Sequence, residues 1–476
     1  MYKKRFAVAG LGLALGVGFV MSAGLTTSAC SSGSSSAGPP VRPDSGGGGD
    51  GTVSDAGTDV VIGSDGGQAL KPFTYPADPG PGAFYVTISG ESNALTGYPF
   101  PPDNFSADSY MPDGWEFQIF EYIVVVDKIT LWSNPDQSTT DQSQHGPAVA
   151  HLDGPFVVDL HKGGKIVGQG GYPELATPIG VIMNQNDNGG AAFDTTGGTR
   201  YGFGFSTVQA TYDAYNVNLD DSEAADFATM VQKGYSVFYR GAVVWKGDDP
   251  GNPYAPCTQT NAGAGEDAGL VQEGDAEVPT YVDGGYDFMK LPQTFTFRLG
   301  FNTPTNYVNC QNFTAQGMGI GNEPNPRGVQ VSTSQYVVAQ ATVHMDHPFW
   351  ESFVENTPVH LDQIAAQYVG STGVPEAHTE DMKGVSPAGF TDKSGTPLPW
   401  HNCSGDNYSP LGDGQMFFYT RGIPVNPAGT CVPGNCNVIR DYYDFLRYNQ
   451  STQGHLNSQG ACYVDRQYPS PVGNSF

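Results

Sequence analysis

The sequence predicts a mainly β protein, an antiparallel β-sandwich or barrel-like fold with a helical, Cys-rich C-terminal cap. From Phe84 onward, short β-branched and aromatic runs alternate with clusters of Gly, Pro, Asn and Asp, the pattern of strands and turns. The composition agrees, since 64 Gly, 36 Pro and 25 Tyr in 476 residues are typical of a turn-rich strand protein. Toward the C-terminus, short helical patterns and four cysteines replace the strand pattern.

The chain begins with a targeting segment. Residues 3–5 are basic, residues 6–25 are almost wholly apolar, and small residues lead to Cys30. This is the order of a secretory signal, so residues 1–29 are excluded from fold prediction. The end of the segment resembles a bacterial lipoprotein signal, which implies lipidation of Cys30. Ordinary cleavage after Ala29 or an uncleaved membrane anchor are the alternatives.

Three further regions follow the signal. Residues 30–71 are Gly, Ser and Asp with few side chains able to build a core, which predicts a disordered tether. Residues 72–345 carry the strand patterns and form the predicted β-sandwich domain. Residues 346–476 change to short helices and irregular segments, so we expect a disulfide-rich cap packed on the sandwich.

Seven segments carry the strand pattern, and two carry a helical one. The helix over residues 220–234 is predicted from acidic residues at its start, apolar residues at helical spacing and a glycine stop. Residues 437–450 have a broad apolar face and predict a second helix. The expected strands lie within residues 83–90, 115–132, 154–164, 199–219, 235–245, 294–302 and 335–345.

The cysteine count favours disulfides in an oxidising compartment. Seven cysteines are an odd number, and lipidation of Cys30 leaves six that can form three disulfides. We expect Cys257 and Cys310 to pair because they bracket an acidic, Gly-rich loop. The absence of Cys-x-x-Cys argues against a thiolate zinc site. The six cysteines are Cys257, Cys310, Cys403, Cys431, Cys436 and Cys462.

The net charge of the chain limits the kinds of molecule that it can bind. A formal net charge of -27 with 21 Lys plus Arg argues against nucleic-acid binding and against docking on anionic lipid. An acidic surface that keeps an exported protein soluble explains the charge without any ligand. We expect a monomer whose partners are a membrane, reached through the lipid anchor, and a protein or carbohydrate ligand.

The strongest candidate site is the stretch VHMDHPFWESFVENTPVH, residues 343–360. A strand over 335–343 should deliver His344 at its end. Asp346-His347-Pro348 and Thr357-Pro358 then predict two successive helix starts, because proline favours the first helical position. This geometry would bring the stretch's three histidines, His344, His347 and His360, to one chain turn.

Imidazole groups suit copper, zinc and non-haem iron. The stretch therefore predicts a transition-metal site, with Asp346, Glu351 or Asp362 orienting the rings. The alternative is structural, with His347 as a helix cap and the third histidine in solvent. The predicted ligands are His344, His347, His360 and Asp346, joined or replaced by His401 and His455 if the C-terminal region folds back.

A second imidazole and carboxylate lie close in sequence. Asp159 and His161 stand two residues apart on one face of a predicted strand, where the carboxylate could orient the ring. A strand end in water explains the same pattern. No nucleophile elbow, phosphate-binding loop or zinc-protease motif is present, so no catalytic residue is assigned.

The segments DLHKGG, HMDHPFWESF and YNQSTQGHL, with the lipoprotein start and acidic tether, resemble a group of uncharacterised bacterial cell-envelope lipoproteins. The resemblance implies export and lipid anchoring, with the outer membrane as the expected location, and brings no known activity. In architecture and residue types the chain is also similar to secreted copper-binding sandwich proteins, which makes copper the first metal to test.

Three functions remain open at this point. Transition-metal binding at the junction between sandwich and cap is the leading hypothesis. A non-enzymatic adhesion or carbohydrate-binding module would use an exposed aromatic face instead. A metal-assisted hydrolase would need an open ligand position and a carboxylate base, for which Glu351 or Asp346 could serve. The sequence favours a protein that is not an enzyme.

Overall fold

The computed structural model describes part of the chain, all of it within one compact unit. No helix in this part combines the length and the apolar character that crossing a membrane requires. Predictions for the signal segment, Cys30 and nearly all of the tether lie outside it. The described residues are 69–100, 102, 110–111, 114–169, 175–196, 198–246, 291–352, 357–359, 361–385, 417–419, 437–439 and 441–469.

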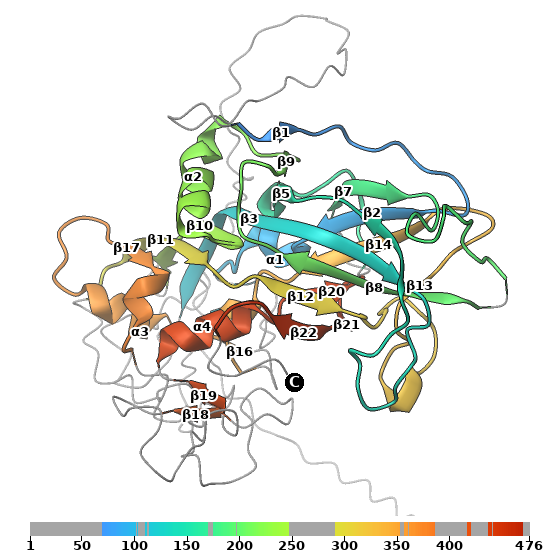
Figure 1. The fold of residues 1–476 in the computed structure, drawn as a ribbon. Helices are drawn as coiled ribbons and strands as arrows, with labels where there is room; N and C mark the ends of the chain where they lie inside the picture. The colour runs from blue at the N-terminus through green and yellow to red at the C-terminus, as the bar shows by residue number, and fades with distance from the viewer. Residues whose placement is uncertain are drawn as a thin grey trace, which may run out of the picture. The chain divides into compact units, whose positions relative to one another are not determined.

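The larger sheet has twelve described strands around the long strand β3. Its main path runs β1-β9-β5-β3-β10-β11-β17 (Figure 1). Strands β4 and β8 also pair with β3. The strands are β1 (Lys71–Pro72), β3 (Trp115–Trp132), β4 (Ala148–Leu152), β5 (Phe156–Asp159), β8 (Arg200–Thr207), β9 (Tyr215–Asn216), β10 (Val237–Trp245), β11 (Thr294–Phe301), β12 (Thr305–Val308), β13 (Val329–Gln330), β17 (Glu376–His378) and β22 (Tyr463–Arg466).

The smaller sheet has six described strands in the order β21-β20-β14-β2-β7-β6. They are β2 (Phe84–Ser89), β6 (Ile166–Val167), β7 (Leu175–Ile182), β14 (Val337–Val343), β20 (Gly454–Leu456) and β21 (Gly460–Ala461). Two short pairs complete the strands: β15 (Trp350–Ser352) with β16 (Thr357–Pro358), and β18 (Phe417–Tyr419) with β19 (Asn437–Ile439).

The mainly β prediction is confirmed, and each of the seven predicted segments contains a strand. The antiparallel prediction holds for most strand pairs, but both sheets are mixed, and the described strands do not close into a barrel. Strands β2 and β14 run parallel, as do β1 and β9, β5 and β9, and β11 and β17. Parallel partners come from distant parts of the chain, so local patterns did not reveal them.

Helices are few in the described residues. They are α1 (Glu91–Thr96), α2 (Ala224–Lys233), α3 (Asp362–Ala365) and α4 (Tyr442–Gln450), with 3-10 turns η1 (Leu160–Lys162), η2 (Asp221–Glu223), η4 (Ile320–Asn322), η5 (His347–Phe349), η6 (Ala366–Tyr368) and η7 (Thr379–Met382). The helix predicted over 220–234 is confirmed: a capping box of Asp220 and Glu223 opens it, and Gly234 ends it at φ 68°.

The helix predicted over 437–450 begins five residues late. Asp441 caps α4 by accepting a hydrogen bond from the backbone N–H of Asp444 at 3.0 Å, which fixes the start at Tyr442. Residues 437–439 form strand β19 instead.

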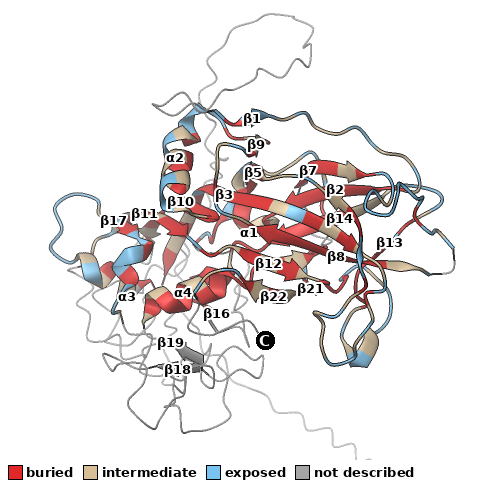
Figure 2. Ribbon diagram, in the orientation of Figure 1, coloured by how far each residue is buried: buried red, intermediate tan, exposed pale blue. Residues whose placement is uncertain are grey.

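Residues beyond the predicted boundary at Asp346 complete both sheets. Strand β20 pairs with β14 in the smaller sheet, and β22 pairs with β12 in the larger one. One buried cluster contains apolar side chains from both sheets, so they pack across a common core (Figure 2). A separate helical, Cys-rich cap is not seen in the described residues, because their C-terminal strands belong to these sheets.

Cys310 forms a disulfide with Cys462, 152 residues away. The predicted pairing of Cys310 with Cys257 is therefore wrong. Antiparallel pairing of β12 with β22 places the two bonded residues side by side, with Cα atoms 3.9 Å apart. Proximity across a sheet decided this pairing, whereas the prediction used proximity along the chain. The remaining candidates, Cys257, Cys403, Cys431 and Cys436, lie outside the described residues.

Candidate metal centre

Three histidines converge beside the end of strand β14. His344 follows β14 directly, His347 opens η5, and His455 lies on β20, whose register places it opposite Thr342 of β14. One ring nitrogen from each histidine lies within 4.8 Å of the others. Neighbouring strands thus bring together side chains separated by more than one hundred residues.

The spacing is somewhat wider than that of a loaded site. Nitrogens bound to one ion by bonds of about 2 Å are at most about 4 Å apart. Since the nitrogens lie within 4.8 Å of one another, the widest pair would need to approach by at most about one ångström around an ion. The ring centroids are 4.4 to 5.3 Å apart, and rotation of the side chains can supply this closure.

His344 is oriented by two partners. Its Nε2 lies 2.9 Å from the carbonyl oxygen of Ser458, and its Nδ1 lies 3.0 Å from a carboxylate oxygen of Glu91. Since a carbonyl only accepts, Nε2 carries a hydrogen. Metal-binding histidines are held in this way, with one nitrogen on an outer acceptor and the other toward the ion. Nδ1 is therefore the nitrogen that His344 could offer to an ion, once it loses the hydrogen that it donates to Glu91.

His347 also has a defined tautomer. Its Nδ1 lies 2.8 Å from the hydroxyl of Thr452, which donates its own hydrogen to the carbonyl of Asn449 at 2.7 Å. The hydroxyl must then accept from His347, so Nδ1 carries the ring hydrogen and the lone pair lies on Nε2. The ring packs on Trp350, with centroids 4.5 Å apart.

His455 has a buried Nδ1 that finds no hydrogen-bond partner in the described part of the chain. An unsatisfied buried nitrogen costs roughly 1–3 kcal/mol. A metal ion bound at this atom would remove the penalty. Of the three rings, this one gives the most direct indication of a missing ligand.

Two carboxyl groups accompany the rings. Glu91 contacts His344, and Asp346 lies 3.8 Å from the same nitrogen and accepts from the amide of Asn93 at 3.3 Å. Burial raises the pKa of Asp346 to about 6, against the favourable charge of His344. The donor set near the rings is therefore imidazole and carboxylate, which suits copper, zinc or iron.

The three histidines differ in the direction in which their pKa values are shifted. Burial opposes protonation of His344, but the charge and hydrogen bond of Glu91 outweigh it and raise the pKa to about 9. For Glu91, burial is outweighed by His344, and the pKa falls to about 2. Burial and the charge of His344 lower the pKa of His347 well below 6.5 and that of His455 to about 3. Two rings therefore stay neutral at pH 7, as metal ligands must.

The backbone around these rings is strained. Glu91, Asn457 and Ser458 have positive φ angles of 63°, 52° and 75°. The hydroxyl of Ser458 donates to the carboxylate of Glu91, which joins two of these positions. Left-handed conformations of residues other than glycine cost about 1–3 kcal/mol and cluster at functional sites. Their meeting here is a second reason to regard the cluster as a site.

The structure brings together four of the six predicted ligands: His344, His347, His455 and Asp346. His360 and His401, and the side chains of Glu351 and Asp362, lie outside its description. Of the two predicted helix starts, the first is a single 3-10 turn. The second is wrong, because Thr357–Pro358 forms strand β16 beside β15.

Sequence reasoning missed Glu91, and no local pattern could have revealed it. This residue follows β2, and only the parallel pairing of β2 with β14 brings it to His344. The predicted contact of Asp159 with the ring of His161 is also wrong. Asp159 instead accepts from the backbone N–H of His161, while the ring lies 2.8 Å from the carbonyl of Ala94.

No family model, curated protein or solved structure matches this chain. The site's own geometry is therefore what supports any assignment of function.

Proposed function

We propose that this protein binds one transition-metal ion, copper or zinc, through His344, His347 and His455. The observation that carries the proposal is the convergence of three ring nitrogens within 4.8 Å. Outer hydrogen bonds that orient two of the rings support it further. Glu91 lies where it can join the ligands or balance the charge of the ion.

The burial of the site favours a closed centre. His344 is 2% exposed and His347 is 5% exposed. An ion among such residues suits stabilisation or electron transfer better than hydrolysis, which needs an open ligand position. Metal-assisted hydrolysis is therefore the weaker alternative.

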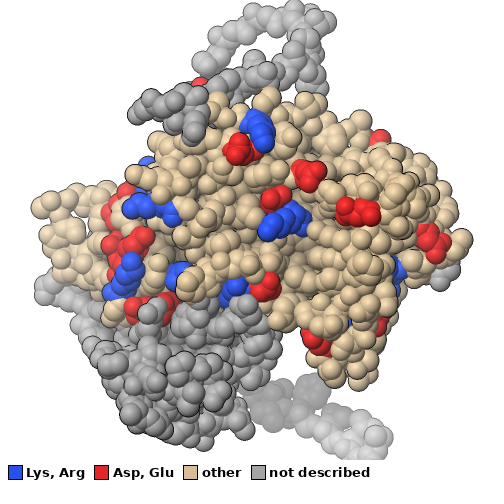
Figure 3. All heavy atoms as spheres, in the orientation of Figure 1, with Lys and Arg blue, Asp and Glu red and all other residues tan. Residues whose placement is uncertain are grey.

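A sugar-binding or adhesive surface is a further alternative with less support. Trp115, Trp245 and Trp350 are at most 7% exposed, so these indoles do not offer a flat binding face. Lys and Arg side chains alternate with Asp and Glu on the face drawn in Figure 3, which shows no continuous basic area among its described residues. Neither feature favours a carbohydrate or nucleic-acid ligand.

We also propose that the protein is exported and anchored to the cell envelope, with the outer membrane as the expected site, through lipid on Cys30. The sequence supports this through the basic, apolar and small-residue order of residues 1–29 and the acidic tether that follows. The disulfide between Cys310 and Cys462 fits the same oxidising compartment.

Elemental analysis of the purified protein tests the metal proposal. We expect close to one copper or zinc ion per chain, and a loss of at least tenfold in affinity in His455→Gln. This variant is chosen because the Nδ1 of His455 has no hydrogen-bond partner among the described residues, so no bond of that atom is lost. His151→Gln is the matched control, since His151 is exposed beside Asp153 and Asp187.

The outcomes separate a specific site from surface binding. If His151→Gln loses the ion and His455→Gln keeps it, the bound metal belongs to the surface. If the native protein takes up neither metal at micromolar concentration, the proposal is wrong.

A further inference from the structure

We propose that the helical segment Asp221–Lys233, formed by η2 and α2, is fastened to the larger sheet by protons shared within two buried carboxyl pairs, Asp159–Glu223 and Glu121–Asp226. The segment loosens when these protons are lost. The inference does not depend on the metal centre.

The first pair joins η2 to strand β5. Asp159 is 0% exposed and Glu223 is 1% exposed. One oxygen of Asp159 accepts from the backbone N–H groups of Tyr122 and His161, each at 2.9 Å. The other oxygen, and one oxygen of Glu223, are buried and face no donor in the described structure. Asp159 lies close enough to raise the pKa of Glu223, and a proton shared between the two carboxyl groups would give both buried oxygens a partner.

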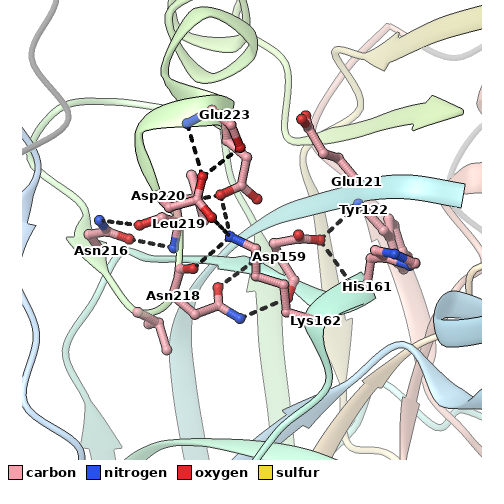
Figure 4. A network of polar contacts seen from close by, with 12 residues as sticks. Glu121, Tyr122, Asp159, His161, Lys162, Asn216, Asn218, Leu219, Asp220 and Glu223 are labelled. Carbon is pink, nitrogen blue, oxygen red and sulfur yellow. Dashed lines mark hydrogen bonds and ion pairs between the residues drawn. The ribbon is translucent and has the colours of Figure 1, made fainter. Parts of the chain in front are cut away.

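The charged groups around Asp159 and Glu223 also favour a proton shared between these two carboxyl groups. The Lys162 ammonium contacts Glu223 and lies 2.9 Å from the carboxylate of Asp220 (Figure 4). Of the three carboxyl groups drawn together there, Asp159, Glu223 and Asp220, Lys162 contacts the last two. Two like charges cannot both remain ionised in a buried pair without a large cost. A proton on Glu223 lowers that cost.

The second pair joins α2 to strand β3. Glu121 is 2% exposed, and the side chain of Asp226 is 4% exposed. The Arg240 guanidinium contacts Glu121 and lies 3.3 Å from Asp226. The second oxygen of Glu121 is buried without a donor in the described residues, and the nearby Asp226 raises the pKa of Glu121. A proton shared with Asp226 would give this oxygen a partner.

The charged groups that face the second pair come from four elements. Arg298 of β11 contacts Asp226 and lies 3.2 Å from Glu376 of β17. The charge of Glu223 also acts on Arg240, so the two pairs belong to one network. The three carboxyl groups of this half, Glu121, Asp226 and Glu376, face two guanidinium groups, Arg240 and Arg298. One proton again balances the charge.

The expected pH range follows from burial. Desolvation raises the pKa of Glu223 to about 8 and the pKa of Glu121 to about 7, from an ordinary value of 4.5. Between pH 4.5 and 8 these two carboxyl groups then hold more protons in the folded protein than in the unfolded one. Their contribution to the free energy of unfolding must therefore fall as pH rises through this range, and level off above it.

The segment covers a distinct apolar cluster. Phe227 and Met230 of α2 pack with Ile123 and Val125 of β3 and with Leu70, which directly precedes β1. Loss of both protons places repelling charges at the two polar contacts of the segment while leaving this cluster intact. The segment should then open locally before the sheets do.

Hydrogen–deuterium exchange of the full-length protein tests the proposal. After correction for intrinsic exchange rates, we expect amides of α2 to lose about tenfold or more of their protection between pH 5.5 and pH 8. Glu223→Gln should abolish most of this loss, because an amide can donate to Asp159 without titrating. Glu121→Gln should reduce it separately. Asp221→Asn, an exposed change in the same turn, should respond as the native protein does.

Two results would overturn the proposal. One is a change in native protection of α2 well below tenfold between these pH values. The other is an undiminished pH response in both glutamine variants. If Glu223→Gln does not fold, the native profile and Glu121→Gln still decide the outcome.

Discussion

Glu91 and His344 form the charged contact at the candidate centre, and both are largely buried, at 12% and 2% exposure. In metal-free protein at pH 7 the ring is protonated and paired with the carboxylate. Glu91→Gln keeps the side-chain shape and removes its charge, which leaves a buried imidazolium without a counterion. We expect the free energy of unfolding to fall by roughly 3 kcal/mol, measured by urea denaturation.

The pH dependence of this effect distinguishes charge from packing. His344 has a raised pKa, so the stability that it contributes is present below pH 6.5 and is lost as pH rises through about 9. Glu91 has a lowered pKa, so its contribution is present above pH 4.5 and is lost as pH falls toward 2. The cost of Glu91→Gln should therefore be largest near neutral pH. A cost that is constant from pH 5 to 10 would show that packing is responsible, and Asp213→Asn, an exposed change, should cost little at any pH.

Single residues were predictable where the sequence places them together. His344, His347 and Asp346 lie within four positions, so their proximity at a chain turn could be inferred directly. Glu91 lies more than 250 positions earlier, and its role depends on a parallel strand pairing that has no local pattern.

At the scale of elements, alternation and turn residues predicted which segments form strands, but not their partners. Strand β14 and its histidine were inferred from apolar runs, whereas its neighbours β2 and β20 come from opposite ends of the described chain. Thr357-Pro358 matched a helix start, yet pairing with β15 made it a strand. Local preference was overridden by tertiary pairing, as is common for short segments.

The disulfide gives a prediction at the same scale. Replacing Cys310 and Cys462 together by Ala removes a link across 152 residues. We expect a loss of about 2–5 kcal/mol in the free energy of unfolding, because the unfolded chain regains conformational entropy. Urea denaturation measures the loss. Peptide mapping without reductant should show the two cysteine peptides joined, and recovery of Cys310 linked to Cys257 would contradict the pairing.

For the whole molecule, a bound ion would connect three regions of the chain: α1 through Glu91, the end of β14, and strand β20. An ion that binds only the folded state stabilises it by about 2.7 kcal/mol at one hundred times its dissociation constant. We expect copper or zinc to raise the unfolding temperature of the full-length protein, and a chelator to reverse the rise. His455→Gln should show no rise, and an equal rise in that variant would place the binding elsewhere.

The last described strands have a consequence for the order of events during folding. Strands β20 and β22 complete the two sheets, and β20 carries the third histidine. Before residues 454–466 have left the ribosome, neither sheet has all of its strands paired. The three-histidine site cannot form before then either. Long-range pairing of this kind is slow. An ion bound at the proposed site would thus be selected late, from the metals present in the compartment where folding finishes.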